Sequence, residues 1–157
     1  MMEVAQAEEP IREKRRGPSL PFLLIMGFLA LAVVGVVAAQ KIAYMIYRED
    51  ARQPLEHLER VRAIPVSEAT LPLYLQECAH LERAMQEFQE LHPPGSLEST
   101  FDSHSSICNA ATLYLGAAQN FKLYMMGYVS SPDTAEDMLE AGSRRLYQAR
   151  KAWREWR

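Results

Sequence analysis

The chain has 157 residues, a formal net charge of −3, seven glycines and two cysteines. This length is enough for one domain of ordinary size beside an N-terminal extension, but not for two domains. The bases gather at one end, because residues 143–157 carry six Lys or Arg and a single Glu. A nucleic-acid-binding protein needs a basic face across its whole domain, so we expect no nucleic-acid partner.

Residues 1–19 are polar, contain two prolines and show no apolar periodicity. Such a segment cannot offset the entropy of ordering, so the sequence predicts a disordered tail. Its bases, Arg12, Lys14, Arg15 and Arg16, stand directly before an apolar run. Basic clusters in this position are retained in the cytoplasm, and we expect the N-terminus to lie there.

Residues 20–39, LPFLLIMGFLALAVVGVVAA, carry no charge and no strongly polar side chain. At about 1.5 Å per residue, a helix of this length matches the roughly 30 Å hydrocarbon core of a bilayer. The sequence predicts a single-pass transmembrane signal-anchor helix over 20–47, with residues 48–157 outside the cytoplasm. Lys41, Tyr44 and Tyr47 suit the membrane interface.

A cleavable signal peptide is the alternative to an anchor, because Val37, Ala38 and Ala39 resemble a small-residue cleavage site. The apolar run is longer than the h-region of an ordinary signal peptide, and helical character continues beyond Ala39. Both features favour an uncleaved anchor in the cell membrane.

The remainder of the chain has the spacing of amphipathic helices, expected over 40–63, 67–91, 97–128 and 131–157. Pro54 predicts a kink or restart in the first of these helices, and Pro93-Pro94-Gly95 ends the second. In the last helix the apolar residues recur alternately four and three positions apart, as in a coiled coil. We therefore expect an all-α chain: one transmembrane helix followed by an antiparallel up-and-down bundle. The bundle has four helices, or three with 40–63 as a separate stalk.

The C-terminal helix carries a second group of candidate membrane-interface residues. These are Arg150, Lys151, Trp153, Arg154, Trp156 and Arg157. Bases with tryptophans on one helix suit anionic headgroups and the interfacial layer, which makes membrane lipid an expected partner. A simpler interpretation stays open: bases in a last turn favour the helix macrodipole, and both tryptophans continue the apolar stripe.

Cys78 and Cys108 stand at nearly equal distance from Pro93, so an antiparallel hairpin centred there would bring them together. The sequence thus offers a candidate disulfide outside the cytoplasm, with two buried free thiols as the equal alternative. His104, one turn before Cys108, adds a weaker metal-site candidate made of Cys78, His104 and Cys108. A fourth ligand is not evident, and we expect no metal and no cofactor.

Sequence motifs of catalysis are missing: the chain has no HExxH, GxSxG, Gly-rich phosphate loop or CxxC. We therefore expect that the protein is not an enzyme. The sequence favours a membrane-anchored interaction module, an accessory subunit or envelope scaffold that binds a protein partner or a second copy of itself. The alternative is an extracytoplasmic ligand or metal sensor that acts through a partner.

Overall fold

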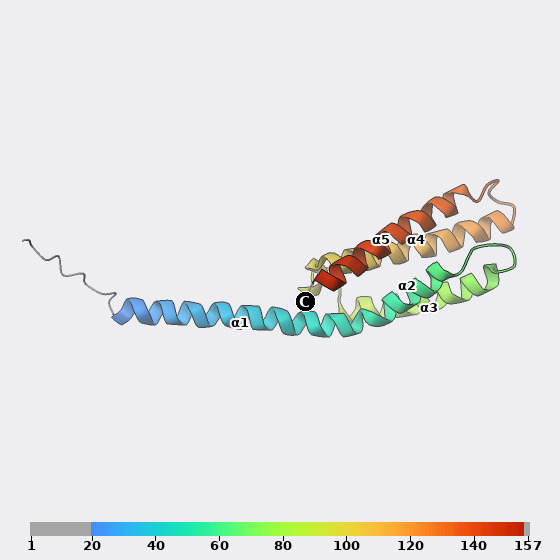
Figure 1. Cartoon of the computed structure of the whole chain (residues 1–157). Helices are drawn as coiled ribbons and strands as arrows, with labels where there is room; N and C mark the ends of the chain where they lie inside the picture. The colour runs from blue at the N-terminus through green and yellow to red at the C-terminus, as the bar shows by residue number, and fades with distance from the viewer. Residues whose placement is uncertain (1–19, 156–157) are drawn as a thin grey trace, which may run out of the picture. The chain divides into compact units, whose positions relative to one another are not determined.

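A computed structural model describes residues 20–155 of the chain. This part consists of five α-helices and one short 3₁₀ helix and contains no strand, which confirms the all-helical prediction (Figure 1). The α-helices are α1 (Leu20–Asp50), α2 (Arg52–Ala63), α3 (Leu71–Leu91), α4 (Asp102–Met125) and α5 (Asp133–Glu155), with the 3₁₀ helix η1 (Glu98–Thr100) before α4. The chain divides into two compact units, of which the first ends at Ala39 and the second begins at Gln40.

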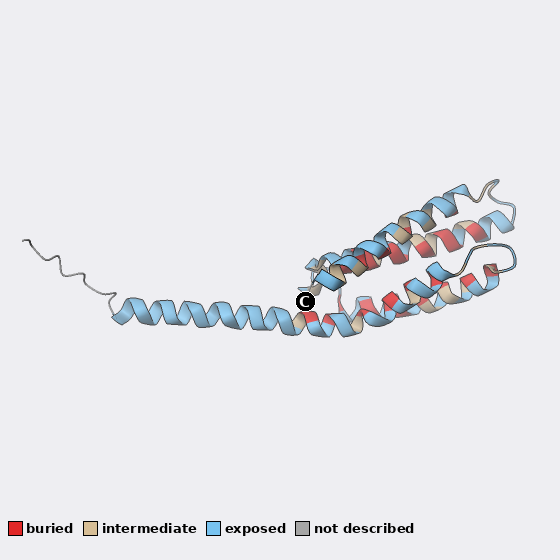
Figure 2. Cartoon of the chain, viewed as in Figure 1, coloured by how far each residue is buried: buried red, intermediate tan, exposed pale blue. Residues whose placement is uncertain are grey.

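In the first unit, every residue of the stretch 20–39 is exposed (Figure 2). A helix that is apolar on all sides has no polar face to turn toward water. Among the described helices, α1 alone is long and apolar enough to cross a membrane.

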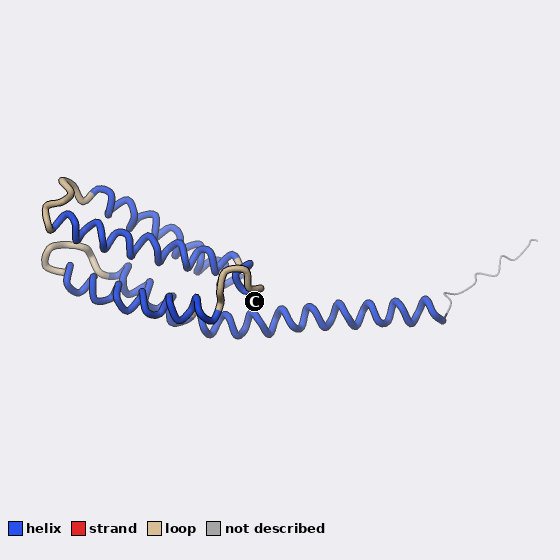
Figure 3. Tube along the Cα trace, turned by 180° about the vertical axis from the view of Figure 1, so that it is seen from behind, coloured by secondary structure: helices blue, strands red, loops and turns tan. Residues whose placement is uncertain are grey.

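The second unit is built from helices that pack side by side: α2 lies along α3, and α4 lies along α5 (Figure 3). Smaller contacts join α3 to α4, and α2 to both α4 and α5. The unit has one large apolar core and a smaller cluster formed by Leu71, Ala117, Phe121 and Ala135. Its largest fully buried side chains include Tyr47, Leu55, Leu58, Tyr74, Leu81, Phe88, Ile107, Tyr114 and Leu146.

Pro54 explains why α1 and α2 are separate helices. Proline has no N–H for the bond to the carbonyl of Asp50, and its ring clashes with that carbonyl. The helix is accordingly interrupted at Ala51, between the two elements. The prediction of a restart near Pro54 is confirmed.

The second unit starts earlier than the bundle expected over residues 48–157. Tyr44 and Tyr47 are 5% and 0% exposed, and the Tyr47 hydroxyl accepts a hydrogen bond of 3.0 Å from Ser103 on α4. The sequence suggests the membrane interface for both tyrosines, whereas the structure places them in the protein core. Large amphipathic rings suit either environment, and the partners that decide between them, among them Phe88 and Ser103, lie more than 40 residues away.

Candidate interaction groove beside α2 and α5

A groove of about 490 Å³ lies beside α5, the end of α1 and the start of α2. We call it the α2/α5 groove. It is lined by Met45, Arg48, Glu49, Arg52, Leu55, Glu56, Arg150 and Trp153. Arginine and glutamate supply most of its polar surface, and Trp153 and Met45 supply apolar surface. It therefore contains the side chains of a recognition surface, and no serine, cysteine or histidine nucleophile lines it.

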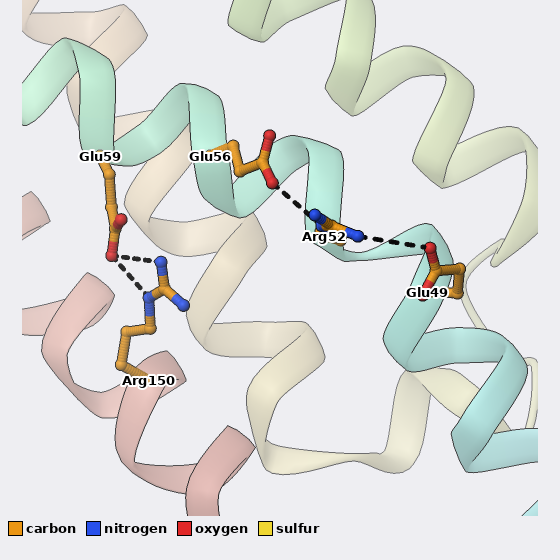
Figure 4. Close-up of polar contacts among 5 residues, drawn as sticks. All are labelled: Glu49, Arg52, Glu56, Glu59 and Arg150. Carbon is orange, nitrogen blue, oxygen red and sulfur yellow. Dashed lines mark hydrogen bonds and ion pairs between the residues drawn. The ribbon is translucent and has the colours of Figure 1, made fainter.

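Ion pairs hold most of these charges in fixed positions (Figure 4). The Arg52 Nε donates to Glu56 at 3.0 Å, one helical turn further along α2. The Nη1 of the same guanidinium group lies 3.8 Å from the Glu49 carboxylate. Between elements, the Arg150 Nε on α5 donates to Glu59 on α2 at 2.6 Å. The two residues of this last pair are 91 positions apart in the sequence, and they join α2 to α5.

Arg48 and Trp153 form the remaining contact across the groove. The guanidinium carbon of Arg48 lies 5.3 Å from the centroid of the Trp153 ring, within the range of a cation–π interaction. Trp153 is half-buried and packs against the apolar core. Trp153 therefore contacts both the apolar core and the guanidinium group of Arg48.

A second hollow of about 620 Å³ adjoins the α2/α5 groove, since Arg150 lines both. Four bases face it: Arg62 from α2, and Arg150, Lys151 and Arg154 from α5. Glu59 and Glu155 also line it and pair with Arg150 and Lys151. No ion pair joins Arg62 or Arg154 to a described residue, so this basic hollow has two guanidinium groups available for an anion. Guanidinium groups bind phosphate and carboxylate in bidentate geometry.

Several predicted interface residues are therefore brought together here: Arg150, Lys151, Trp153 and Arg154 lie on one side of α5. Lys41 is exposed at the start of the second unit. Trp156, Arg157 and the four bases Arg12, Lys14, Arg15 and Arg16 lie outside the described residues. The sequence signal for Arg52 and Glu56 is their spacing of four on one helix. No local signal could have paired Arg150 with Glu59.

The two cysteines are free thiols in the structure, with Cys78 buried and Cys108 half-buried. Cys78 lines a small cavity together with Leu115 and Ala118 of α4, whereas Cys108 has Gln89 as a hydrogen-bond partner. Gln89 is eleven residues, or roughly 16 Å of helix, beyond Cys78 on α3. The sulfurs are thus not opposite each other, unlike in the hairpin expected around Pro93.

The physical reason for this shift is the link between α3 and α4. The hairpin prediction assumed that α4 begins soon after Pro94, but the chain adds η1 and starts α4 only at Asp102. Burial raises the pKa of Cys78 to about 11, and burial is also the main cause that raises the pKa of Cys108. Both effects disfavour the thiolate, which is the reactive and metal-binding form.

His104 does not join the cysteines either. Its ring is buried and packs on those of Phe88 and Tyr47, at centroid distances of 5.3 and 6.1 Å. Burial, and then the nearby His92, lower its pKa. Across residues 20–155, no group of three His, Cys, Asp or Glu side chains is arranged to hold a metal ion. The candidate set Cys78, His104 and Cys108 is therefore not assembled in this structure.

Comparison with protein families, with curated proteins and with solved structures finds no match for this chain. Its function is therefore inferred from the residues and contacts of the chain itself.

Proposed function

We propose that this chain is a non-catalytic, single-pass membrane-anchored helical interaction module, an accessory subunit or envelope scaffold of a membrane complex. The observation that carries the proposal is the contrast between residues 20–39, which are apolar and wholly exposed, and the packed second unit. Twenty exposed apolar residues in water would cost about 25 cal/mol per Å² of apolar surface. A lipid bilayer removes that cost.

The second unit, in this proposal, is an up-and-down antiparallel bundle made by α2, α3, α4 and α5. Two contacts between α3 and α4 support antiparallel packing: the higher-numbered Gln89 meets Cys108, while the lower-numbered Cys78 meets Ala118. The pairing of neighbours α2 with α3 and α4 with α5 supports the up-and-down order.

The basic side of α5 is proposed to contact anionic lipid headgroups. Tyr44, at the start of the second unit, shares a small cavity with Ala152 and Glu155 at the end of α5. Arg154 and Lys151, on these last turns of α5, carry the charges that would bind lipid phosphate in this contact.

The orientation places the N-terminal tail in the cytoplasm and the bundle outside, following the bases Arg12, Lys14, Arg15 and Arg16. It is tested with a membrane-impermeant maleimide on two variants of the full chain, each made with Cys78 and Cys108 replaced by alanine so that only the introduced thiol can react. Leu97→Cys, at an exposed position of the second unit, should label in intact cells. Gln6→Cys should label only after permeabilisation. The reverse pattern would overturn the orientation.

The interaction role is tested by extraction of the membranes in a mild detergent and native electrophoresis. We expect the chain to migrate as part of a stable complex of several proteins. Migration as a bare monomer would contradict the proposal, and recovery with a stoichiometric small ligand or metal ion would favour a sensor in its place.

A further inference from the structure

A second surface of the unit 40–157 is apolar rather than charged. The residues that end α4 and begin the link to α5 expose five large apolar side chains within six positions. These are Leu123, Tyr124, Met125, Met126 and Tyr128, whose exposed fractions run from 37% to 73%. Tyrosine and methionine are enriched in protein interfaces, and an exposed cluster of this kind is typical of a binding surface.

A cavity of about 220 Å³ lies beside this cluster. We call it the tip groove and define it by its apolar walls: Val66, Leu71, Phe121, Tyr124, Met125 and Pro132. Its floor is a small core cluster of its own, formed by the buried Leu71, Ala117, Phe121 and Ala135. The groove is therefore a packed feature of the unit, built by the α2–α3 link, the end of α4 and the start of α5.

Backbone hydrogen bonds fix the shape of this surface. Tyr128 N donates to Leu123 O at 3.0 Å and Gly127 N donates to Tyr124 O at 2.9 Å, the two bonds of a Schellman motif. Gly127 has φ of +78°, the left-handed conformation that this motif requires and that glycine adopts without strain. On the other wall, the Ser67 N donates to the Thr70 hydroxyl at 2.9 Å. The apolar side chains are thus presented by turns of defined geometry.

Two carboxylates give the tip groove its charge. Glu68 and Glu136 line it, both are exposed, and neither forms an ion pair with a described residue. No base lines the groove. A partner that fills it must therefore supply apolar side chains for the walls and positive charge for the rim.

From this combination we propose that the tip groove binds an amphipathic helix of another protein, with apolar residues three and four apart and Lys or Arg on its flanks. Helices that dock in apolar grooves use this spacing. The inference rests on the proposed interaction function and names the surface and the partner chemistry for it.

The test places the photoreactive residue p-benzoyl-phenylalanine at Tyr124 of the full chain, in the membranes of cells that carry it. The control position is Leu91, which is 63% exposed at the end of α3. After irradiation, the cross-linked peptide is identified by mass spectrometry. We expect an adduct from position 124 whose peptide has an apolar stripe of helical spacing and flanking Lys or Arg.

Charge reversal tests the second half of the inference. Glu68→Lys together with Glu136→Lys should lower the adduct yield on the order of tenfold, because rim charges of like sign repel the partner. Glu82→Lys with Glu87→Lys makes the same change in net charge on exposed positions of α3 and should leave the yield unchanged. Surface changes of this kind have little effect on folding, which circular dichroism verifies.

An acidic peptide, a peptide of this chain itself, or no adduct from a complex that persists in native electrophoresis would each overturn the inference. In the last case the proposed interaction function survives and only its assignment to the tip groove is lost. If the unaltered chain does not migrate in a complex in native electrophoresis, the proposed function itself is contradicted.

Discussion

Residues 20–39 of α1 and helix α4 are both rich in apolar residues, yet the first stretch is exposed and the second is packed against other helices. Residues 20–39 of α1 are all exposed, whereas α4 buries ten residues against its neighbours. The difference lies in the arrangement of polar residues. α4 keeps Asn109, Thr112, Gln119 and Lys122 on an exposed side, while residues 20–39 contain no strongly polar side chain. A helix with one polar side can pack in a protein, and a helix without one needs a surrounding apolar medium.

The largest effect is expected from charges placed in the exposed stretch. Leu29→Arg with Val33→Arg introduces two bases near the middle of residues 20–39, each of which costs roughly 2.5–3.5 kcal/mol in a membrane helix. The expected result is loss of most of the chain from the carbonate-resistant membrane fraction. Leu73→Arg with Leu91→Arg, at exposed apolar positions of α3, is the control and should remain in that fraction. Equal retention of the two variants in the carbonate-resistant fraction would show that residues 20–39 do not differ from α3 in their contact with the membrane.

Tyr114 is a buried residue of α4 and tests the packed region in the same way. It is 1% exposed, its hydroxyl lies 3.0 Å from that of Ser143, and its ring sits against Gly142 of α5. Tyr114→Ala should lower the free energy of unfolding by about 3–5 kcal/mol, because it leaves a cavity in the core.

This change is measured by thermal unfolding of the full chain in lipid nanodiscs, followed by circular dichroism. Tyr147→Ala removes the same side chain at a position that is 70% exposed, and it should change stability by no more than about 0.5 kcal/mol. A similar loss in both variants would show that α4 is not packed as the structure has it.

Much of this architecture could be predicted from periodicity alone. Apolar residues spaced three and four apart on α2 and α3 are buried, including Leu55, Leu58, Cys78 and Phe88, because this spacing marks the side of a helix that meets a core. On α4, Tyr124 and Met125 continue the apolar arc by their spacing but are exposed. Spacing identifies an apolar side, but it does not tell where the neighbouring helix ends.

The candidate sites were less predictable, because they depend on contacts between distant residues. The sequence predicts that Cys78 and Cys108 lie opposite each other on neighbouring helices. Because η1 precedes α4, the register of α4 along α3 is shifted, and Cys108 lies beside Gln89 instead. The pairs Arg48–Trp153 and Glu59–Arg150 each join residues more than 90 positions apart. Only the docking of α5 beside α2 creates these contacts, and no local pattern encodes it.

The burial of His104 can be tested through the pH dependence of stability, because burial changes the pKa of its side chain. Burial is the main cause that lowers its pKa; His92 lowers it further and Glu98 acts in the opposite direction. A histidine whose folded pKa lies below its unfolded value of about 6.5 favours folding above that pH. The stabilisation is lost as the pH falls from there through the folded pKa.

We therefore expect the free energy of unfolding of the full chain to decrease between pH 7.5 and pH 5.5, by at most about 1.4 kcal/mol per pH unit for a single proton. His104→Phe keeps an aromatic ring beside Phe88 and Tyr47 but cannot be protonated. Its free energy of unfolding should depend less on pH over this range. An unchanged slope in His104→Phe would assign the pH dependence to other groups.

The smallest effect is expected from the ion pair between Glu59 and Arg150, which joins α2 to α5 outside the core. A double-mutant cycle with Glu59→Ala and Arg150→Ala should give a coupling of about 0.2–1 kcal/mol, since the side chains are 47% and 33% exposed. The coupling should decrease in 1 M salt, because the Debye length is then only about 3 Å and the salt screens exposed charges. Glu140 and Arg144, which are 69% and 67% exposed on one helix, form the matched pair and should couple by no more than about 0.5 kcal/mol. No measurable coupling between Glu59 and Arg150 would mean that this ion pair does not hold α5 against α2. The α2/α5 groove would then lack its fixed wall.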